Sequence, residues 1–497
     1  MSVAAKPFDQ RTADALADGQ LRATLRSVTT VILGSRRAGL GRLDDSDAWR
    51  DHARRIRAHT LSRLDVYLDQ FVSSVEARGG HAYYAATAAD AVRYVSDLAV
   101  ARGVKLAVKS KSMVTEEIEL NHGLESAGVR VVETDLGEYI VQLANDRPSH
   151  IVMPIMHMTR HQVADLFRAK IGATDADVAD IPAMTALARR VLREEFVNAD
   201  MGISGVNFAV AETGSITTCT NEGNGRLCTT MPRIHVAMMG IERIVPTVHD
   251  LGVMLQVLAR SATGQNLTVY SNVVTGPRPR DPGRAEGDGP DEFHVVMVDN
   301  GRSRVLGSEL AEILYCIRCG ACLNTCPVFH QIGGHAYGGV YPGPVGAVLT
   351  PALDGLGPFH ELPQASSLCG ACREVCPVRI DIPRMLLELR ANTVDAGYSP
   401  WWVTQGIKAL AWAGTRPAMF RWAGAAAARA TRLLATNGWI RRMPGHLSAW
   451  TKTRDFPAMA TTSFQERWKK RKPGFRTGEE TRFPQEGEET GFPRHHS

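Results

Sequence analysis

The sequence predicts an α/β domain followed by a mainly α-helical, cysteine-rich domain. From residue 81 to about 270, short β-branched runs alternate with helical stretches, a pattern typical of a largely parallel sheet. Two cysteine motifs with ferredoxin-like spacing follow between residues 316 and 377. The predicted parts are an N-terminal helical segment (1–80), the α/β domain (81–305), the cysteine-rich domain (306–396), a basic C-terminal segment (397–475) and a disordered polar tail (476–497).

Hydrophobic periodicity gives the individual elements. We expect one long helix over 47–78, because apolar residues recur there at steps of three and four until Gly79-Gly80. The predicted strands are 105–108, 129–132, 150–154, 207–211, 215–220, 235–239 and 292–298. The other predicted helices are 115–126, 160–169, 184–198, 308–314 and 382–396, and the Gly/Pro-rich stretch 276–290 is expected to be a mobile loop.

The composition is that of a globular protein. Of its 497 residues, 44% are hydrophobic and 22% are charged, and the net charge of +5 makes no whole-chain case for nucleic-acid binding. The first 20 residues contain no apolar signal segment, and no apolar run reaches the roughly 18 residues of a spanning helix. We therefore expect a cytoplasmic protein. Seven of the nine cysteines belong to one metal-binding pattern and do not form a disulfide scaffold, which implies a reducing compartment.

The first cysteine motif reads CIRCGACLNTCP and begins at Cys316. This is the spacing of bacterial two-cluster ferredoxins, in which three cysteines hold one cubane and the fourth ligates the neighbouring cluster. The second motif, CGACREVCP, begins at Cys369. By the same crossover, the first [4Fe-4S] cluster is predicted to be held by Cys316, Cys319, Cys322 and Cys376.

The second cluster is predicted to be held by Cys326, Cys369 and Cys372, and it lacks a fourth thiolate. The position that a fourth cysteine would take is Ser366. Ser366, Ser367, a water or a missing iron could fill the gap, so a three-thiolate [4Fe-4S] cluster and a [3Fe-4S] cluster both remain open. A zinc ribbon is the alternative, but zinc takes four ligands per closed site, which seven cysteines fit badly.

Two stretches of the α/β domain have the composition of a ligand site. Lys109–Asn121, KSKSMVTEEIELN, follows a strand and opens a helix, so it suits either an anion or a capped helix with solvated lysines. Local sequence favours the capped helix. Glu212–Arg226 contains NEGNGR, which could line a pocket or form a hairpin turn. Glu222 within it has no recognisable base or orienting partner and is a weak candidate nucleophile.

Several other reactive residue types are expected to be structural. Cys219 and Cys228 lie outside the ligand spacing and are expected to be buried. His150 and His157 flank an apolar run and are expected to have structural hydrogen bonds. Asp299–Arg302 is expected to form a turn with a salt bridge.

The C-terminal segment 397–475 is aromatic and basic. It contains seven of the eight tryptophans, and its cations greatly outnumber its two acids. Its helices are expected to be short, because Pro417, Gly438 and Pro444 interrupt them. We predict that the segment packs partly on the cysteine-rich domain and presents a basic face to an acidic partner or to the inner face of the membrane.

Several long motifs resemble one known family. KSKSMVTEEIELN, ETDLGEYIVQLANDRPSHIVMPIMH, AETGSITTCTNEGNGRL and VDNGRS, followed by CIRCGACLNTCPV, are similar to the iron–sulfur subunit of bacterial lactate-utilisation complexes. The resemblance covers about residues 50–395. It implies an α/β fold similar to ribose-5-phosphate isomerases and CoA transferases, and a complex that oxidises L-lactate to pyruvate. It also implies two partners, a cysteine-rich CCG-motif iron–sulfur subunit and a second lactate-utilisation-domain protein, but no catalytic residues.

Three functions are compatible with these observations. An electron-transfer subunit, rather than the catalytic subunit, is favoured because two predicted [4Fe-4S] clusters occur without a G-x-G-x-x-G dinucleotide fingerprint. The alternative is an α/β enzyme acting on a small anionic or phosphorylated substrate, with structural or redox-sensing clusters. A regulatory scaffold is the third possibility, and turnover after cluster loss or ligand-dependent assembly would distinguish these two from the first.

Overall fold

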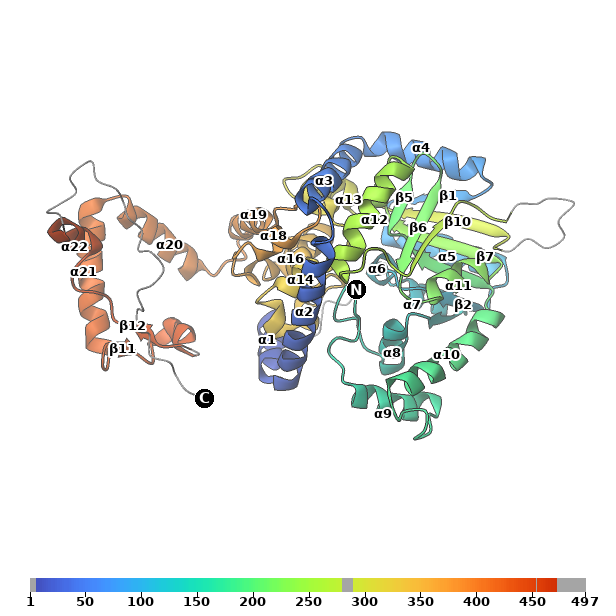
Figure 1. The fold of residues 1–497 in the computed structure, drawn as a ribbon. Coiled ribbons are helices and arrows are strands. Elements are labelled where there is room, and N and C mark those ends of the chain that lie inside the picture. Colours follow the sequence, from blue (N-terminus) through green and yellow to red (C-terminus); the bar gives the residue numbers. More distant parts are fainter. Residues whose placement is uncertain (1–5, 279–288, 453, 472–497) are drawn as a thin grey trace, which may run out of the picture. The chain divides into compact units, whose positions relative to one another are not determined.

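The computed structural model describes residues 6–278, 289–452 and 454–471 (Figure 1). The chain forms two compact units, the first ending at Tyr398 and the second beginning at Ser399. The predicted tail at 476–497, and most of the predicted loop at 276–290, lie outside the described residues. Within the described ranges, no helix has the length and apolar character needed to cross a membrane.

A six-stranded parallel sheet forms the centre of the first unit, which confirms the predicted α/β class. Its order is β1-β10-β7-β4-β2-β3. The strands are β1 (His81–Ala85), β2 (Leu106–Lys109), β3 (Arg130–Glu133), β4 (Met201–Gly205), β7 (Ile234–Gly240) and β10 (Glu292–Val298). Because these strands are parallel, the loops after β2, β4, β7 and β10 meet at one edge, where ligands bind in open α/β sheets.

A second sheet has the order β8-β5-β6-β9 and was not expected from the sequence. Its strands are β5 (Phe208–Val210), β6 (Ser215–Thr220), β8 (Ile244–Val245) and β9 (Tyr270–Val274). The short turn between β5 and β6 makes them an antiparallel hairpin, and β9 continues the antiparallel pairing. The runs predicted at 207–211 and 215–220 are therefore strands, but they belong to this sheet and not to the parallel one.

Helices and the second sheet cover the two faces of the parallel sheet. In β10, Phe293, Val295 and Met297 point to one core while Val296 and Val298 point to the other, as expected for a strand buried on both faces. One face is covered by α5 (Ala88–Ala101), α6 (Met113–Glu117) and α7 (Leu120–Ser126). The other face is covered by α4 (Leu64–Ala77), α8 (Leu136–Ala144), α10 (Ile181–Asn198), α12 (Val248–Ala262) and the second sheet, with α9 (Arg160–Ile171) and α11 (Asn224–Thr230) beside them.

The N-terminal helices join the α/β part to the cysteine-rich part. They are α1 (Phe8–Ala17), α2 (Gly19–Leu40) and α3 (Ser46–Ser62). Helix α2 packs on α12 and also on α14 and α15 of the cysteine-rich part (Figure 1). One hydrophobic core therefore extends from Leu25 through the second sheet to Leu389.

The cysteine-rich part is mainly helical, as predicted. It comprises α13 (Arg302–Leu306), η2 (Ala311–Tyr315), α14 (Ala321–Thr325), α15 (Phe329–Ile332), η3 (His335–Tyr337), α16 (Gly343–Asp354), α17 (Leu356–Phe359), η4 (Leu362–Gln364), α18 (Ala371–Val375) and α19 (Ile382–Asp395). The excursion between the two motifs contains α16, which is almost entirely buried. It is therefore part of the core and not a surface insertion.

Four predicted elements differ from the structure. The helix predicted over 47–78 is two helices, because Arg63 leaves the helical region with φ −135° and ψ 38°. The helix predicted over 115–126 is likewise divided into α6 and α7 at Glu119, which has a φ of 54°. Residues 150–154 form turns instead of a strand, because the His150 side chain accepts the backbone N–H groups that a strand would use. Residues 308–314 contain only a short 3₁₀ turn, η2.

The second unit contains α20 (Trp401–Gly414), α21 (Pro417–Leu434), β11 (Trp439–Ile440), η5 (Gly445–Thr451), β12 (Phe456–Pro457) and α22 (Phe464–Arg471). Each of its seven tryptophans is at least 44% exposed. Among the side chains that the structure describes here, only Ala428 and Ile440 are buried hydrophobic residues. The aromatic side chains of this unit therefore do not form a core of their own.

Candidate cluster-binding site and adjoining cavity

Four of the predicted ligands surround one enclosed cavity. Cys316 and Cys319 come from the loop before α14 and Cys322 from its first turn, and Cys376 reaches the same cavity from the end of α18. Apolar side chains, including Ile151, complete the walls. Burial, together with the neighbouring Cys376 thiol, raises the pKa of Cys319 to about 12. Convergent thiols in an apolar enclosure fit an iron–sulfur cluster, because bound iron takes thiolates as ligands.

The other three cysteines form a second group beside the first. Cys326 and Cys372 are buried and Cys369 is exposed. Burial raises the pKa of Cys372 to about 12, and the nearby thiols of Cys326 and Cys369 contribute. The Ser366 hydroxyl accepts the Leu368 N–H at 3.1 Å, as in a local turn. Helix α14, which contains Cys322, packs on α18, which contains Cys372, so the two groups adjoin.

Backbone N–H groups around the first motif donate hydrogen bonds to cysteine sulfur atoms. The N–H of Arg318 donates to the Cys316 Sγ at 3.4 Å, and that of Phe329 donates to the Cys326 Sγ at 3.5 Å. Such bonds tune cluster potential in iron–sulfur proteins. Gly320 has a φ of 73°, and a Cβ there would lie 3.1 Å from the His150 ring. Glycine is therefore needed where the His150 turn packs on the cysteine loop.

Arginines from the N-terminal helices hold the second motif. Arg50 of α3 donates to the carbonyl oxygen of Cys376 at 3.0 Å and also to that of Glu374. Arg36 of α2 donates to the Val375 carbonyl at 2.6 Å. Sequence reasoning missed both arginines, because more than 300 residues separate them from the carbonyls they bind and no local pattern marks them.

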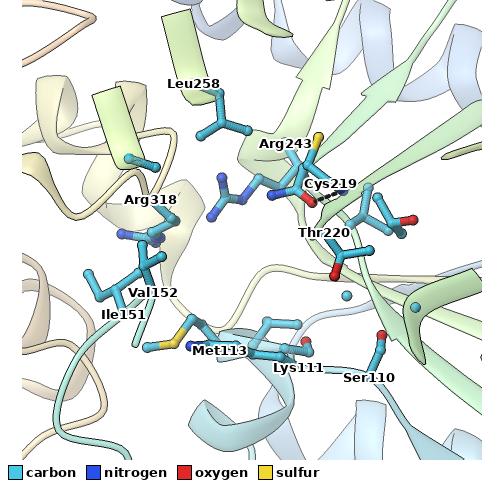
Figure 2. Close-up of a pocket in the computed structure, with 18 of the residues that line it drawn as sticks. Ser110, Lys111, Met113, Ile151, Val152, Cys219, Thr220, Arg243, Leu258 and Arg318 are labelled. Atoms are coloured by element: carbon cyan, nitrogen blue, oxygen red, sulfur yellow. Dashed lines mark hydrogen bonds between the residues drawn. The ribbon is translucent and has the colours of Figure 1, made fainter. Parts of the chain in front are cut away.

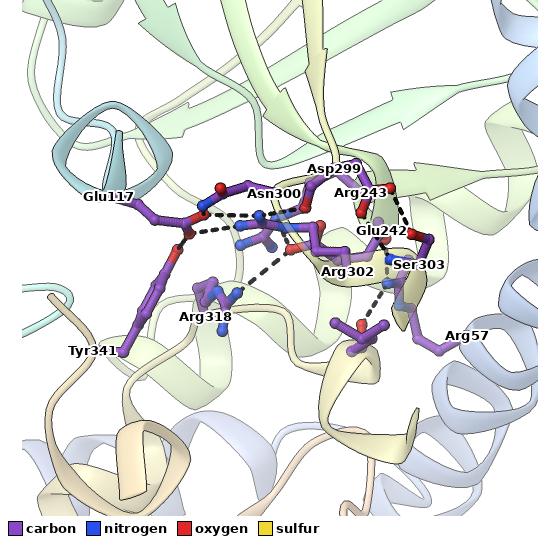
Figure 3. A network of polar contacts seen from close by, with 11 residues as sticks. Arg57, Glu117, Glu242, Arg243, Asp299, Asn300, Arg302, Ser303, Arg318 and Tyr341 are labelled. Carbon is purple, nitrogen blue, oxygen red and sulfur yellow. Dashed lines mark hydrogen bonds and ion pairs between the residues drawn. The ribbon is translucent and has the colours of Figure 1, made fainter. Parts of the chain in front are cut away.

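A buried ion-pair network joins the α/β domain to the cysteine-rich part (Figure 3). Arg302 binds Glu117 with two nitrogens, at 2.8 and 2.7 Å, and its Nε donates to the Glu242 Oε2 at 2.8 Å. The Glu117 carboxylate also accepts from Asn300 at 2.8 Å and from the Tyr341 hydroxyl at 2.6 Å. The turn and salt bridge expected at Asp299–Arg302 are confirmed, and the partner of the salt bridge lies in the KSKSMVTEEIELN stretch.

Glu242 is the acid on which several buried arginines converge. Arg318 Nη2 approaches its Oε1 at 3.4 Å, and Arg243 Nε approaches the same atom at 3.6 Å. Burial alone would raise the pKa of Glu242, but Arg302, Arg243 and Arg318 together lower it to about 2. Arg57 of α3 completes the network by donating to the carbonyls of Ile244 and Leu314 at 2.9 and 3.0 Å.

A cavity of about 290 Å³ opens beside this network at the carboxyl edge of the parallel sheet (Figure 2). Its lining comes from the loops after β2, β4 and β7, from β6 and α12, and from Arg318 and Tyr341 of the cysteine-rich part. Figure 2 shows the guanidinium groups of Arg243 and Arg318 pointing into the same space, with Lys111 and Thr220 also on the wall. The cavity therefore adjoins the loop that carries the first cysteine group.

The KSKSMVTEEIELN stretch is a capped helix, but its lysines are not solvated. Ser112 accepts the Thr115 N–H as the cap of α6. Lys109 is fully buried and pairs with Glu133 at 2.7 Å and with Glu116 at 2.9 Å. Lys111 lies on the cavity wall.

The NEGNGR stretch lines the cavity, and it opens α11 instead of a hairpin. Glu222 is exposed, and its carboxylate accepts the Leu136 N–H at 3.4 Å. Cys228 is buried, as expected, whereas Cys219 is half-buried on the cavity wall.

The two histidines have structural hydrogen bonds. His150 is buried, its Nδ1 accepts the N–H groups of Val152 and Met153, and burial lowers its pKa to about 3. The ring nitrogens of His157 contact Ser149 Oγ and Asp146 Oδ2 at 2.9 and 3.0 Å. Neither side chain belongs to the cavity.

Comparison with known proteins places these features in a family. The chain matches the LUD domain over residues 68–298, a 4Fe-4S dicluster domain over 312–380 and the C-terminal domain of lactate utilisation protein B over 404–473. It is 45% identical to Lactate utilization protein B of Bacillus pumilus over 95% of this chain and 98% of the relative. The chain belongs to the lactate utilisation protein B family. An Escherichia coli relative named Uncharacterized electron transport protein YkgF is also 45% identical, over 93% of this chain and 96% of its own length.

The family assignment confirms the resemblance seen in the sequence. The 4Fe-4S dicluster domain matched over residues 312–380 contains all the cysteines of the two groups described above. The third match covers most of the aromatic second unit, so that unit is a family feature. The protein is therefore a member of the lactate utilisation protein B family that carries a 4Fe-4S dicluster domain.

Proposed function

We propose that this protein is the electron-transfer subunit of a complex that oxidises L-lactate to pyruvate. When bound, two [4Fe-4S] clusters supply one-electron redox chemistry. Cys316, Cys319, Cys322 and Cys376 would hold the first, and Cys326, Cys369 and Cys372 would hold the second with three thiolates. The observation that carries the proposal is the convergence of Cys376 with the first three cysteines in one enclosure.

The surrounding residues support this role in three ways. The arginines of α2 and α3 fix the carbonyls at 374–376, which orients the Cys376 thiol toward the first group. Backbone N–H groups donate to sulfur at both sites. The packing of α14 on α18 brings the two ligand groups next to each other, which suits electron passage between them.

The exposed second unit supports assembly with other proteins. Its solvent-facing tryptophans resemble the aromatic residues that are enriched in protein interfaces. We propose a CCG-motif iron–sulfur subunit and a second lactate-utilisation-domain protein as partners, in the cytoplasm or peripherally at the inner membrane face. The fold likeness to ribose-5-phosphate isomerases and CoA transferases belongs to the same proposal.

Anaerobic purification tests the cofactor content. We expect a brown protein with acid-labile sulfide and about seven to eight iron atoms per chain, because the second cluster loses an iron readily where it lacks a thiolate. Stoichiometric zinc without sulfide would overturn the proposal.

Reduction of the purified complex tests the electron-transfer role. Adding L-lactate to the complex with its partners should produce the EPR signals of reduced clusters in this chain. A chain that contains clusters but stays oxidised in a complex turning over lactate would contradict electron transfer.

A further inference from the structure

The lining of the 290 Å³ cavity includes four cations, Lys111, Arg243, Arg302 and Arg318, against three acids, Asp135, Glu222 and Glu242. Lys111, Arg243 and Arg318 line it, and Arg302 has both sides of its guanidinium occupied by Glu117 and Glu242. Glu242 is the shared partner of Arg243 and Arg318, at 3.6 and 3.4 Å, which are long for charge-assisted hydrogen bonds.

Arg318 is the most incompletely paired of these cations. Its side chain is 7% exposed, and its Nε and Nη1 have no hydrogen-bond partner in the part of the chain that the structure describes. One face of the guanidinium stacks on the Tyr341 ring at 4.4 Å. The Lys111 Nζ is also buried without a hydrogen bond, and its nearest carboxylate oxygen, on Glu138, is 3.6 Å away. Buried cations with incomplete hydrogen bonding are costly, so these groups favour the binding of an anion.

The remaining walls suit a small organic molecule. Ile151, Val152 and Leu258 supply apolar surface, while Thr218 and Asn207 supply polar groups. The Thr218 hydroxyl is buried and also has no partner among the described residues. Polar groups form at least half of the cavity lining, which suits a charged small ligand better than an apolar one.

We propose that this cavity is a binding site for a small organic acid, whose carboxylate lies between Arg243 and Arg318. Planar guanidinium groups pair well with carboxylates. The Thr218 hydroxyl and the Lys111 ammonium are available to a second polar group of the same molecule. The proposal does not depend on electron transfer, because binding is measured in the oxidised protein without turnover.

The site adjoins the first cysteine group through Arg318. The N–H of Arg318 donates to the Cys316 Sγ at 3.4 Å, while its side chain faces the cavity. A bound carboxylate adds negative charge beside the first cluster and therefore favours the oxidised state. Linkage then requires the acid to bind more weakly after reduction.

Calorimetric titration of the oxidised, cluster-loaded full chain tests the site. The probes are L-lactate and pyruvate, with neutral lactamide and inorganic phosphate as comparisons. We expect saturable binding of at least one of the two acids, no binding of lactamide, and a more negative potential of the first cluster when the acid is bound.

The matched variants are Arg243→Gln and Arg226→Gln. Arg226 follows Gly225 on α11 but is exposed and does not line the cavity. Arg243→Gln should weaken acid binding at least tenfold, which is about 1.4 kcal/mol, and Arg243→Lys should recover part of it. Arg226→Gln should bind like the wild type. Absence of acid binding, binding of phosphate alone, or an unaltered affinity in a folded Arg243→Gln protein would overturn the proposal.

Discussion

Replacing Arg302 by methionine tests how strongly the buried network stabilises the first unit. The folded environment lowers the pKa of Glu242 from 4.5 to about 2, and Arg302 is the largest attractive cause. At about 1.36 kcal/mol per pKa unit, ionised Glu242 contributes about 3 kcal/mol at neutral pH. Arg302→Met also leaves Glu117 without its bidentate partner, so we expect a loss of about 3–5 kcal/mol in unfolding free energy.

The pH dependence of this loss follows from the direction of the pKa shift. A depressed carboxyl pKa stabilises the fold fully above the unfolded value of 4.5, and that stabilisation disappears as the pH falls toward 2. The wild type and Arg302→Met should therefore differ most at pH 7, and the difference in unfolding free energy should narrow as the pH falls from about 4.5 toward 2.

Anaerobic urea unfolding followed by far-UV circular dichroism measures both effects. The matched control is Arg190→Met, because Arg190 forms an exposed ion pair with Asp177, with its side chain 62% exposed. This control should cost less than about 1 kcal/mol. Adding Glu117→Gln to Arg302→Met should restore part of the stability. A loss in Arg302→Met no larger than in Arg190→Met would refute the reasoning.

Three further predictions concern the clusters and the second unit. Cys376→Ala should remove the EPR signal of the first cluster and Cys326→Ala that of the second; loss of only the cluster nearest in sequence would exclude the crossover. Arg50→Gln should shorten the half-life of the first cluster under air by several-fold, because it removes the hydrogen bonds to the Cys376 carbonyl. The half-life is read from the decay of the visible absorption, and an unchanged half-life would show that these hydrogen bonds do not protect the cluster. Truncation after Gly397 should retain both clusters while weakening complex formation in pull-down assays or membrane association in vesicle assays. Loss of the clusters would instead show that the C-terminal segment 397–475 is needed for the core of the cysteine-rich part.

Local patterns were enough to predict much of the fold. Strand β10 occupies residues 292–298, as its β-branched run indicates, and the ends of most other predicted strands agree within about two residues. The spacing of the first motif and its glycine similarly identified the iron–sulfur domain. These features depend on neighbouring residues in the chain, which is why periodicity and spacing reveal them.

Tertiary structure alone decided the partners of the buried charged groups. Glu117, in the KSKSMVTEEIELN stretch, accepts hydrogen bonds from Arg302 and Tyr341, which lie 185 and 224 residues further along the chain. Likewise, the cavity gathers Lys111, Arg243 and Arg318 from separate loops at the edge of the parallel sheet. Burial in a low-dielectric core makes such charges depend on their exact neighbours, and strand order sets those neighbours. The sequence by itself therefore determined the elements and the metal-binding motif, whereas packing determined the ion pairs and the cavity.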